Sequence, residues 1–151
     1  MQWAEAADEG KARERVLSDD EIQAVLSAAT GELGWPFGPL FRLLLLTAQR
    51  RDEVGTVERT DLDLDDRLWA MPRHKAKNDY GHDVQLSDQA VEIIRGLPRI
   101  VGDYVFSTDG KTPISGFSRA KLRLDELMTK ASSKELSRGS YTTCAALAAE
   151  D

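Results

Sequence analysis

A short, almost purely apolar segment at residues 40–46 constrains the fold most. A helix over this segment, which follows Trp35-Pro36, would have almost no polar face, because its apolar side chains are Leu40, Phe41, Leu43, Leu44, Leu45 and Leu46. A helix that is apolar nearly all round belongs in a protein core. Crossing a bilayer takes about 20 apolar residues, more than this segment offers. We therefore expect it to form the centre of one core.

Length and composition fit a single globular unit. The chain has 151 residues, of which 41% are hydrophobic, enough for one core and too few for two full domains. The only cysteine, Cys144, has neither a disulfide partner nor neighbours at metal-ligand spacing. Glu5, Asp8 and Glu9 do not fit the basic start of a secretory signal. We expect a soluble cytoplasmic protein with no membrane partner, metal or small-molecule cofactor.

The charge pattern limits how the chain could meet nucleic acid. A formal net charge of −6 argues against binding by bulk attraction alone. Residues 95–138 nevertheless carry 9 Lys+Arg against 5 Asp+Glu. A locally basic face is therefore compatible with the sequence.

Helical patterns cover much of the chain. Ser18 and Glu21 have the spacing of a capping box, and apolar residues then recur at helical intervals up to Gly31. Ser87 is placed to cap a second such helix, which Pro98 ends, and residues 115–131 predict the last helix. Helices therefore dominate the expected fold.

The pattern changes between residues 61 and 86. Residues 61–64 alternate between Asp and Leu, whereas residues 68–71 and 82–86 are typical of strands on either side of a polar turn at residues 78–81. Residues 104–106 predict one more short extended piece. We expect a mainly α protein with a small antiparallel β-sheet.

Cations near this sheet are the candidates for chemistry. Cleaving DNA without a metal requires fixed cations around the scissile phosphate, and the candidates are Arg50, Arg51, Arg73, Lys75 and Lys77. Two of them, Arg50 and Lys77, also have an ordinary interpretation. Arg50 could pair with Glu53 or Asp52 on the surface, and Lys77 could simply be solvated in a polar hairpin.

Two further residues leave the same choice open. His82 begins a strand and could make a structural hydrogen bond rather than contact a ligand. Glu53 could support Arg50 by a charge-assisted hydrogen bond or could face water. Spacing alone does not decide between these alternatives.

Taken in order, residues 16 to about 128 resemble the catalytic domain of the tyrosine recombinases of the phage-integrase type. Residues 15–22 look like the domain opening, and residues 44–54 (LLLTAQRRDEV) resemble the segment with the first catalytic arginine. Residues 61–63 match the stretch before the hairpin. Lys77-Asn78 together with residues 82–87 (HDVQLS) resembles the hairpin that bears the catalytic lysine. The sequence departs from the family at Ala48 and Asp52, where glycine is usual, and at Gln85, where proline is common.

The resemblance implies a DNA breaking-rejoining fold and roles for particular residues. Arg50 would hold the scissile phosphate with Glu53 in support, and Lys77 would protonate the departing 5′ oxygen. Double-stranded DNA is the implied partner, and other recombinase protomers are a further one. The residues expected to contact DNA are Arg51, Arg73, His74, Lys75 and His82.

The nucleophile that the resemblance requires is missing. No His-x-x-Arg motif is present, and the surroundings of Tyr80, Tyr104 and Tyr141 do not resemble those of the family's nucleophilic tyrosine. Residues 141–147 (YTTCAAL) can be encoded so that a shifted reading frame spells His-Asp-Leu-Arg-Arg-Thr. Upstream, residues 137–140 permit Pro-Trp, one free position and then Leu, Ile or Val in the same frame. This indicates a frameshift between about Lys130 and Ser137.

The expected organisation has three parts. Residues 1–15 form a linker, residues 16–131 form an incomplete recombinase catalytic domain, and residues 132–151 form an atypical tail outside the family's frame. The function implied is site-specific DNA recombination or integration, in a form without strand transfer. The alternatives are a non-enzymatic remnant that binds DNA or interferes with a recombinase, and an inactive remnant that aggregates.

Overall fold

The computed structural model describes residues 16–131, and its first helix, α1 (Asp19–Thr30), begins as the sequence predicts. The Ser18 hydroxyl accepts a hydrogen bond from the Glu21 amide at 3.3 Å. The Glu21 carboxylate in turn accepts one from the Ser18 amide at 2.9 Å. These reciprocal bonds satisfy two amides that a helix start leaves without partners. The capping box is confirmed.

Helix α2 (Phe37–Thr47) supplies the centre of the core. Leu40 is fully buried and Leu44 is 2% exposed. The helix packs against α1 on one side and against α4 (Asp88–Arg95) on another, as expected for a helix that is apolar nearly all round. It ends at Ala48, whose backbone is left-handed with φ 53° and ψ 25°.

A three-stranded antiparallel sheet follows two short helical turns, α3 (Arg51–Gly55) and η1 (Arg59–Asp61). The strands β1 (Leu62–Asp63), β2 (Leu68–Met71) and β3 (His82–Gln85) lie in that order across the sheet. Trp69 pairs with Val84, and Met71 pairs with His82. The predicted hairpin is therefore confirmed, and β1 adds an edge strand to it. The turn η2 (Arg73–Lys75) lies in the β2–β3 connection.

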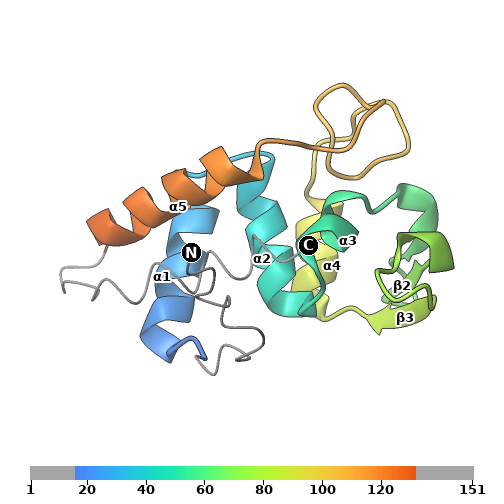
Figure 1. Ribbon diagram of the computed structural model, residues 1–151, viewed down its shortest axis with the longest axis horizontal. Coiled ribbons are helices and arrows are strands. Elements are labelled where there is room, and N and C mark those ends of the chain that lie inside the picture. Colours follow the sequence, from blue (N-terminus) through green and yellow to red (C-terminus); the bar gives the residue numbers. More distant parts are fainter. Residues whose placement is uncertain (1–15, 132–151) are drawn as a thin grey trace, which may run out of the picture.

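The second half of the described chain is a capped helix, a long loop and a final helix. Ser87 caps α4 by accepting a hydrogen bond from the Ala90 amide at 3.2 Å. In the loop, the expected extended piece at residues 104–106 makes only an isolated bridge, between Tyr104 and Glu58. Helix α5 (Phe117–Ala131) then packs on α1, at the far end of the molecule from the sheet (Figure 1).

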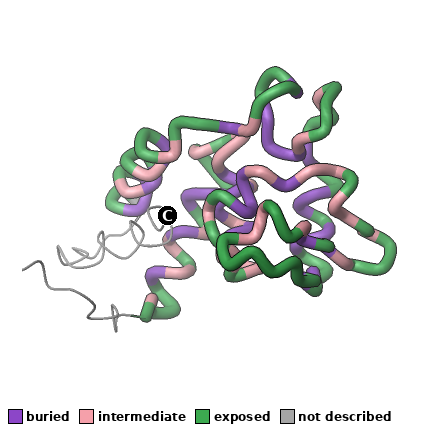
Figure 2. The backbone as a smooth tube through the Cα atoms, turned by 45° about the vertical axis from the view of Figure 1, so that its right-hand side comes forward, coloured by how far each residue is buried: buried purple, intermediate pink, exposed green. Residues whose placement is uncertain are grey.

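Buried residues gather where the helices pack together, whereas exposed residues follow the outer turns, including residues 77–83 of the hairpin (Figure 2). Only Glu21, Glu53 and Ser107 are polar or charged and buried among residues 16–131. No helix in this range is long and apolar enough to span a membrane. The fold is thus mainly helical with a small antiparallel sheet.

Candidate nucleic-acid interface

The buried carboxylate of Glu53 connects the α2–α3 junction to the β2–β3 hairpin. Glu53 is 6% exposed, and its Oε2 accepts a hydrogen bond from the Arg50 amide at 3.0 Å. Its Oε1 lies 3.5 Å from the Lys77 amide, which points toward it. A buried carboxylate requires such donors, because water cannot solvate it. The interpretation in which Glu53 faces water is therefore wrong.

The Arg50 side chain remains available at this junction. Its guanidinium lies 3.9 Å from Glu53 Oε1, and the side chain is 42% exposed. The backbone of Arg50 is extended, with φ −72° and ψ 151°, directly before α3. The long ion pair and the exposure leave most of the guanidinium donors facing solvent. The backbone of Arg50 is thus held in place, whereas its guanidinium group is accessible to a ligand.

The hairpin connection presents further cations. Lys77 is exposed, and its ammonium group has no hydrogen bond or ion pair to any residue in the described range. The exposed Arg73 donates from Nε to the Asp79 carbonyl oxygen at 2.7 Å. His74 is also exposed. The Glu53 contacts therefore bring the backbone of a cation-bearing loop next to that of Arg50.

Lys75, by contrast, is turned into the protein. Its Nζ lies 2.7 Å from Asp61 and 2.8 Å from Glu58, and its side chain is 12% exposed. Burial lowers the pKa of Lys75, but the hydrogen bonds and charges of Asp61 and Glu58 outweigh this, so that its pKa is raised. The charge of Lys75 is compensated internally, which gives it a role in anchoring the hairpin connection to η1.

His82 makes the structural hydrogen bond that was one of its two interpretations. Gln49 donates from Nε2 to the Thr47 carbonyl oxygen at 3.1 Å, so that its side-chain oxygen faces His82 Nε2 at 3.1 Å. Because an amide oxygen only accepts, this arrangement fits the tautomer of His82 that donates from Nε2. His82 Nδ1 is the ring nitrogen left for another contact.

Arg51 occupies a different environment from Arg50. Its guanidinium carbon lies 5.1 Å from the centre of the Phe117 ring, and its Nε donates to Asp52 at 2.9 Å. The Arg51 side chain is only 18% exposed. A cation over an aromatic face contributes to packing. Arg51 therefore joins α3 to the start of α5.

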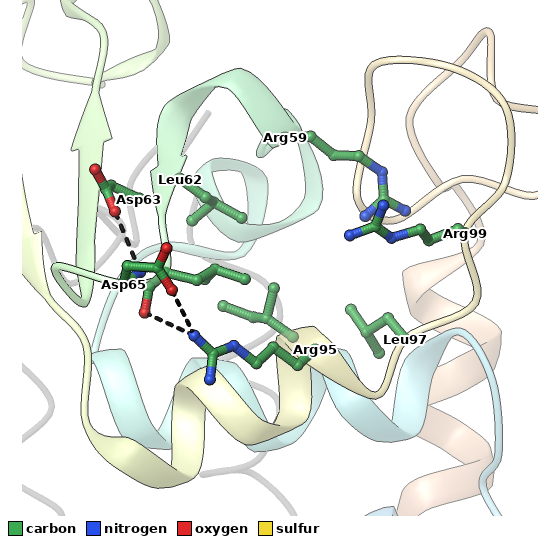
Figure 3. A pocket seen from close by; sticks show the side chains of 9 residues that line it. Arg59, Leu62, Asp63, Asp65, Arg95, Leu97 and Arg99 are labelled. Atoms are coloured by element: carbon green, nitrogen blue, oxygen red, sulfur yellow. Dashed lines mark hydrogen bonds and ion pairs between the residues drawn. The ribbon is translucent and has the colours of Figure 1, made fainter.

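A separate pocket of about 730 Å³ lies between β1 and the end of α4 (Figure 3). Its wall includes Arg95, which binds Asp65 at 2.9 Å, and Arg59, which donates to the Pro98 carbonyl oxygen at 3.3 Å. Apolar side chains such as Leu62 and Leu97 form other parts of it. The pocket includes none of the predicted site residues.

These features define a mainly helical fold in which the β2–β3 connection, a cationic hairpin loop with Arg73, His74 and Lys77, lies beside the α2–α3 junction. A crystal structure of XerA recombinase matches this chain with a TM-score of 0.58 and 20% sequence identity. The match covers 82% of this chain and 45% of the XerA chain, so this chain spans less than half the length of the XerA chain. No family model and no curated protein sequence matches the chain. The likeness establishes the fold.

Sequence reasoning missed the contacts that assemble this region. Gln49 was not singled out, although it holds His82, and neither were Glu58 and Asp61, which hold Lys75. Gln49 adjoins Arg50, but nothing in the spacing indicates that Lys75 pairs 14 residues back with Asp61. The predicted linker at 1–15 and the predicted tail at 132–151, with Tyr141 and Cys144, lie outside the described residues.

Proposed function

We propose that this chain binds double-stranded DNA as the arginine- and lysine-bearing part of a tyrosine-recombinase catalytic domain. The observation that carries the proposal is the Glu53 carboxylate, which contacts the amides of both Arg50 and Lys77 on a recombinase-like fold. Two cations fixed side by side at their backbones suit a phosphodiester, whose oxygens carry the charge.

The proposal assigns different roles to the cations. Arg50 and Lys77 contact the backbone of one strand, Arg50 through its guanidinium fork and Lys77 as a flexible point charge. Arg73, His74 and His82 make secondary contacts along the hairpin. Lys75 and Arg51 act indirectly, because their charged groups are occupied within the protein.

Strand transfer is not part of the proposed function of this chain. Of the tyrosines in the described residues, Tyr80 lies in the hairpin connection and Tyr104 pairs with Glu58 in the loop after α4. Neither position resembles that of the family's nucleophile. We expect no covalent protein–DNA product when the chain is incubated with duplex DNA and denatured before electrophoresis. A labelled band shifted by the mass of the chain would contradict this assignment.

The binding test uses fluorescence anisotropy of a labelled duplex over a range of salt concentrations. Wild-type binding should weaken with salt, and Arg50→Ala and Lys77→Ala should each reduce the salt slope by about 1. Arg119→Ala provides the matched control, because Arg119 is exposed on α5, away from the hairpin. Equal losses in all three variants, or no binding by the wild-type chain, would overturn the proposal.

We further propose that residues 137–147 are translated in a reading frame that is shifted from that of an ancestral recombinase gene. The support is the compatibility of this stretch with Pro-Trp and His-Asp-Leu-Arg-Arg-Thr in a shifted frame. Sequencing the gene from the codon of Leu124 to well beyond that of Asp151 tests it. A shifted frame that continues through His-x-x-Arg to a tyrosine near its end would support the frameshift. A shifted frame that stops or loses the motif would make the tail native.

A further inference from the structure

Tyr80 is an exposed aromatic residue at the tip of the cationic hairpin connection. Its side chain is 76% exposed, and no aromatic stacking contact with another described residue involves its ring. The nearby exposed side chains of Lys77 and Asn78 are polar. A large aromatic ring in water adds nothing to the core. The stability of the fold therefore gives no reason for a tyrosine at this position.

The backbone on the N-terminal side of Tyr80 is fixed. Arg73 donates from Nε to the Asp79 carbonyl oxygen at 2.7 Å, and its Nη2 lies 3.5 Å from the Asp79 carboxylate. The Asp79 amide donates to the Ala76 carbonyl oxygen at 3.0 Å. Asp79 is also left-handed, with φ 54°, a conformation that aspartate tolerates better than most residues.

The backbone on the C-terminal side is fixed by close packing. A Cβ atom added at Gly81 would lie 3.0 Å from the Met71 carbonyl oxygen and 3.2 Å from the Arg73 amide nitrogen. Contacts this short are tighter than most Cβ atoms make, so a larger residue at Gly81 would require the neighbouring backbone to shift. The backbone on both sides of Tyr80 is thus in contact with the start of the connection, and such preorganisation reduces the entropy lost on binding.

The chemistry around the ring points to a nucleic-acid base. Lys77 and Arg73 attract phosphates, while an aromatic face stacks on any base. In a continuous duplex both faces of each base are already occupied by neighbouring bases. The ring of Tyr80 can stack only where a base step is open, as at a bulge, gap or mismatch, where unstacking costs least.

We propose that Tyr80 is a stacking contact for an unstacked base, and that it makes this chain prefer DNA with an open base step over a continuous duplex. The inference rests on the proposed function, because Arg50 and Lys77 supply the phosphate contacts that bring DNA to the hairpin. It adds to that function a preferred form of the DNA and the residue that recognises it.

The test compares two labelled DNAs by fluorescence anisotropy: a continuous duplex and the same duplex with a two-nucleotide bulge. The wild-type chain should bind the bulged DNA at least about 5-fold more tightly, the lower end of what one stacked base contributes. Tyr80→Ala should abolish this preference, whereas Tyr80→Phe should keep it. The salt slope should be the same in Tyr80→Ala as in the wild-type chain, because no charge is removed.

Leu122→Ala is the matched control, since Leu122 is 60% exposed on α5, far from the hairpin (Figure 1). It should bind both DNAs as the wild-type chain does. Equal wild-type affinity for both DNAs, or an unchanged preference in Tyr80→Ala, would overturn the inference and leave the proposed function standing. Failure of the wild-type chain to bind either DNA would overturn the proposed function, and this inference with it.

Discussion

Replacing Glu53 by alanine should destabilise the protein more than any exposed glutamate substitution. The carboxylate is 6% exposed and accepts a hydrogen bond from the Arg50 amide at 3.0 Å, with a longer contact to the Lys77 amide at 3.5 Å. Alanine would leave both amides without this acceptor. It would also remove the one carboxylate that the Arg50 and Lys77 amides share.

The geometry sets the expected magnitude. A hydrogen bond to a charged group contributes about 1.5–3 kcal/mol, and the 3.5 Å contact is too long to add much. Release of the carboxylate from its buried position offsets part of this loss. We expect Glu53→Ala to lower the free energy of unfolding by about 2 kcal/mol. Glu53→Gln should lose about half as much, because its amide retains one oxygen for the Arg50 amide.

Urea denaturation followed by tryptophan fluorescence measures this difference, with the buried Trp69 as a reporter of the sheet. The control is Glu126→Ala, because Glu126 is 63% exposed and its ion pair with Arg123 should contribute less than about 1 kcal/mol. If Glu53→Ala unfolds at the same urea concentration as Glu126→Ala, the carboxylate does not hold the junction, and the reasoning is refuted.

Three further outcomes are expected. Ala48→Gly should raise the free energy of unfolding by about 0.5–1 kcal/mol. The left-handed conformation costs alanine more free energy than is lost by ordering the more flexible glycine on folding. A lower urea midpoint would contradict this. Hydrogen bonds from the Thr112 and Lys111 amides and the Ser107 hydroxyl hold the pKa of Asp109 well below its usual range. The stability that Asp109 contributes is therefore present above the pKa of its carboxyl group in the unfolded chain, and it is lost as pH falls through the pKa of that group in the folded chain. Asp109→Ala should thus lose less stability on acidification than the wild-type chain. Parallel curves of stability against pH for the two proteins would count against this. The pKa of Lys75 is raised, because the hydrogen bonds and charges of Asp61 and Glu58 outweigh the lowering effect of burial. The stability that Lys75 contributes is therefore present below the pKa of its amine in the unfolded chain and is lost as pH rises through its pKa in the folded chain. Lys75→Met should be less stable at neutral pH and should lose less stability in alkali, as thermal melts across pH would show.

Much of the fold could be predicted because its signals are local. Ser18 and Ser87 begin helices through bonds to amides three residues away, and residues 68–71 and 82–86, which are typical of strands on either side of a polar turn, match two paired strands. The sequence predicted the short extended piece at 104–106 less well, because its bridge to Glu58 forms only when the long loop folds back onto a segment that is distant in the sequence. Likewise, β1 becomes an edge strand only once β2 is in place.

The candidate site was predicted as a set of residue types, but not as an arrangement. Arg50, Glu53 and Lys77 were singled out through the resemblance to tyrosine recombinases. The structure adds that the Glu53 carboxylate contacts the amides of both Arg50 and Lys77. It also separates cations that look equivalent in sequence. Lys75 and Lys77 are two residues apart, yet one is 12% exposed between two carboxylates and the other faces solvent.

By itself, the sequence determined where the longer helices and the two strands of the hairpin form and which helix lies at the centre, because caps, turns and apolar periodicity act over a few residues. The tertiary structure decided which charges are compensated and which remain open. Glu53 meets Lys77 across 24 residues, and Gln49 meets His82 across 33. The free energy of such pairs depends on the path of the chain between the partners, and no local pattern encodes that path.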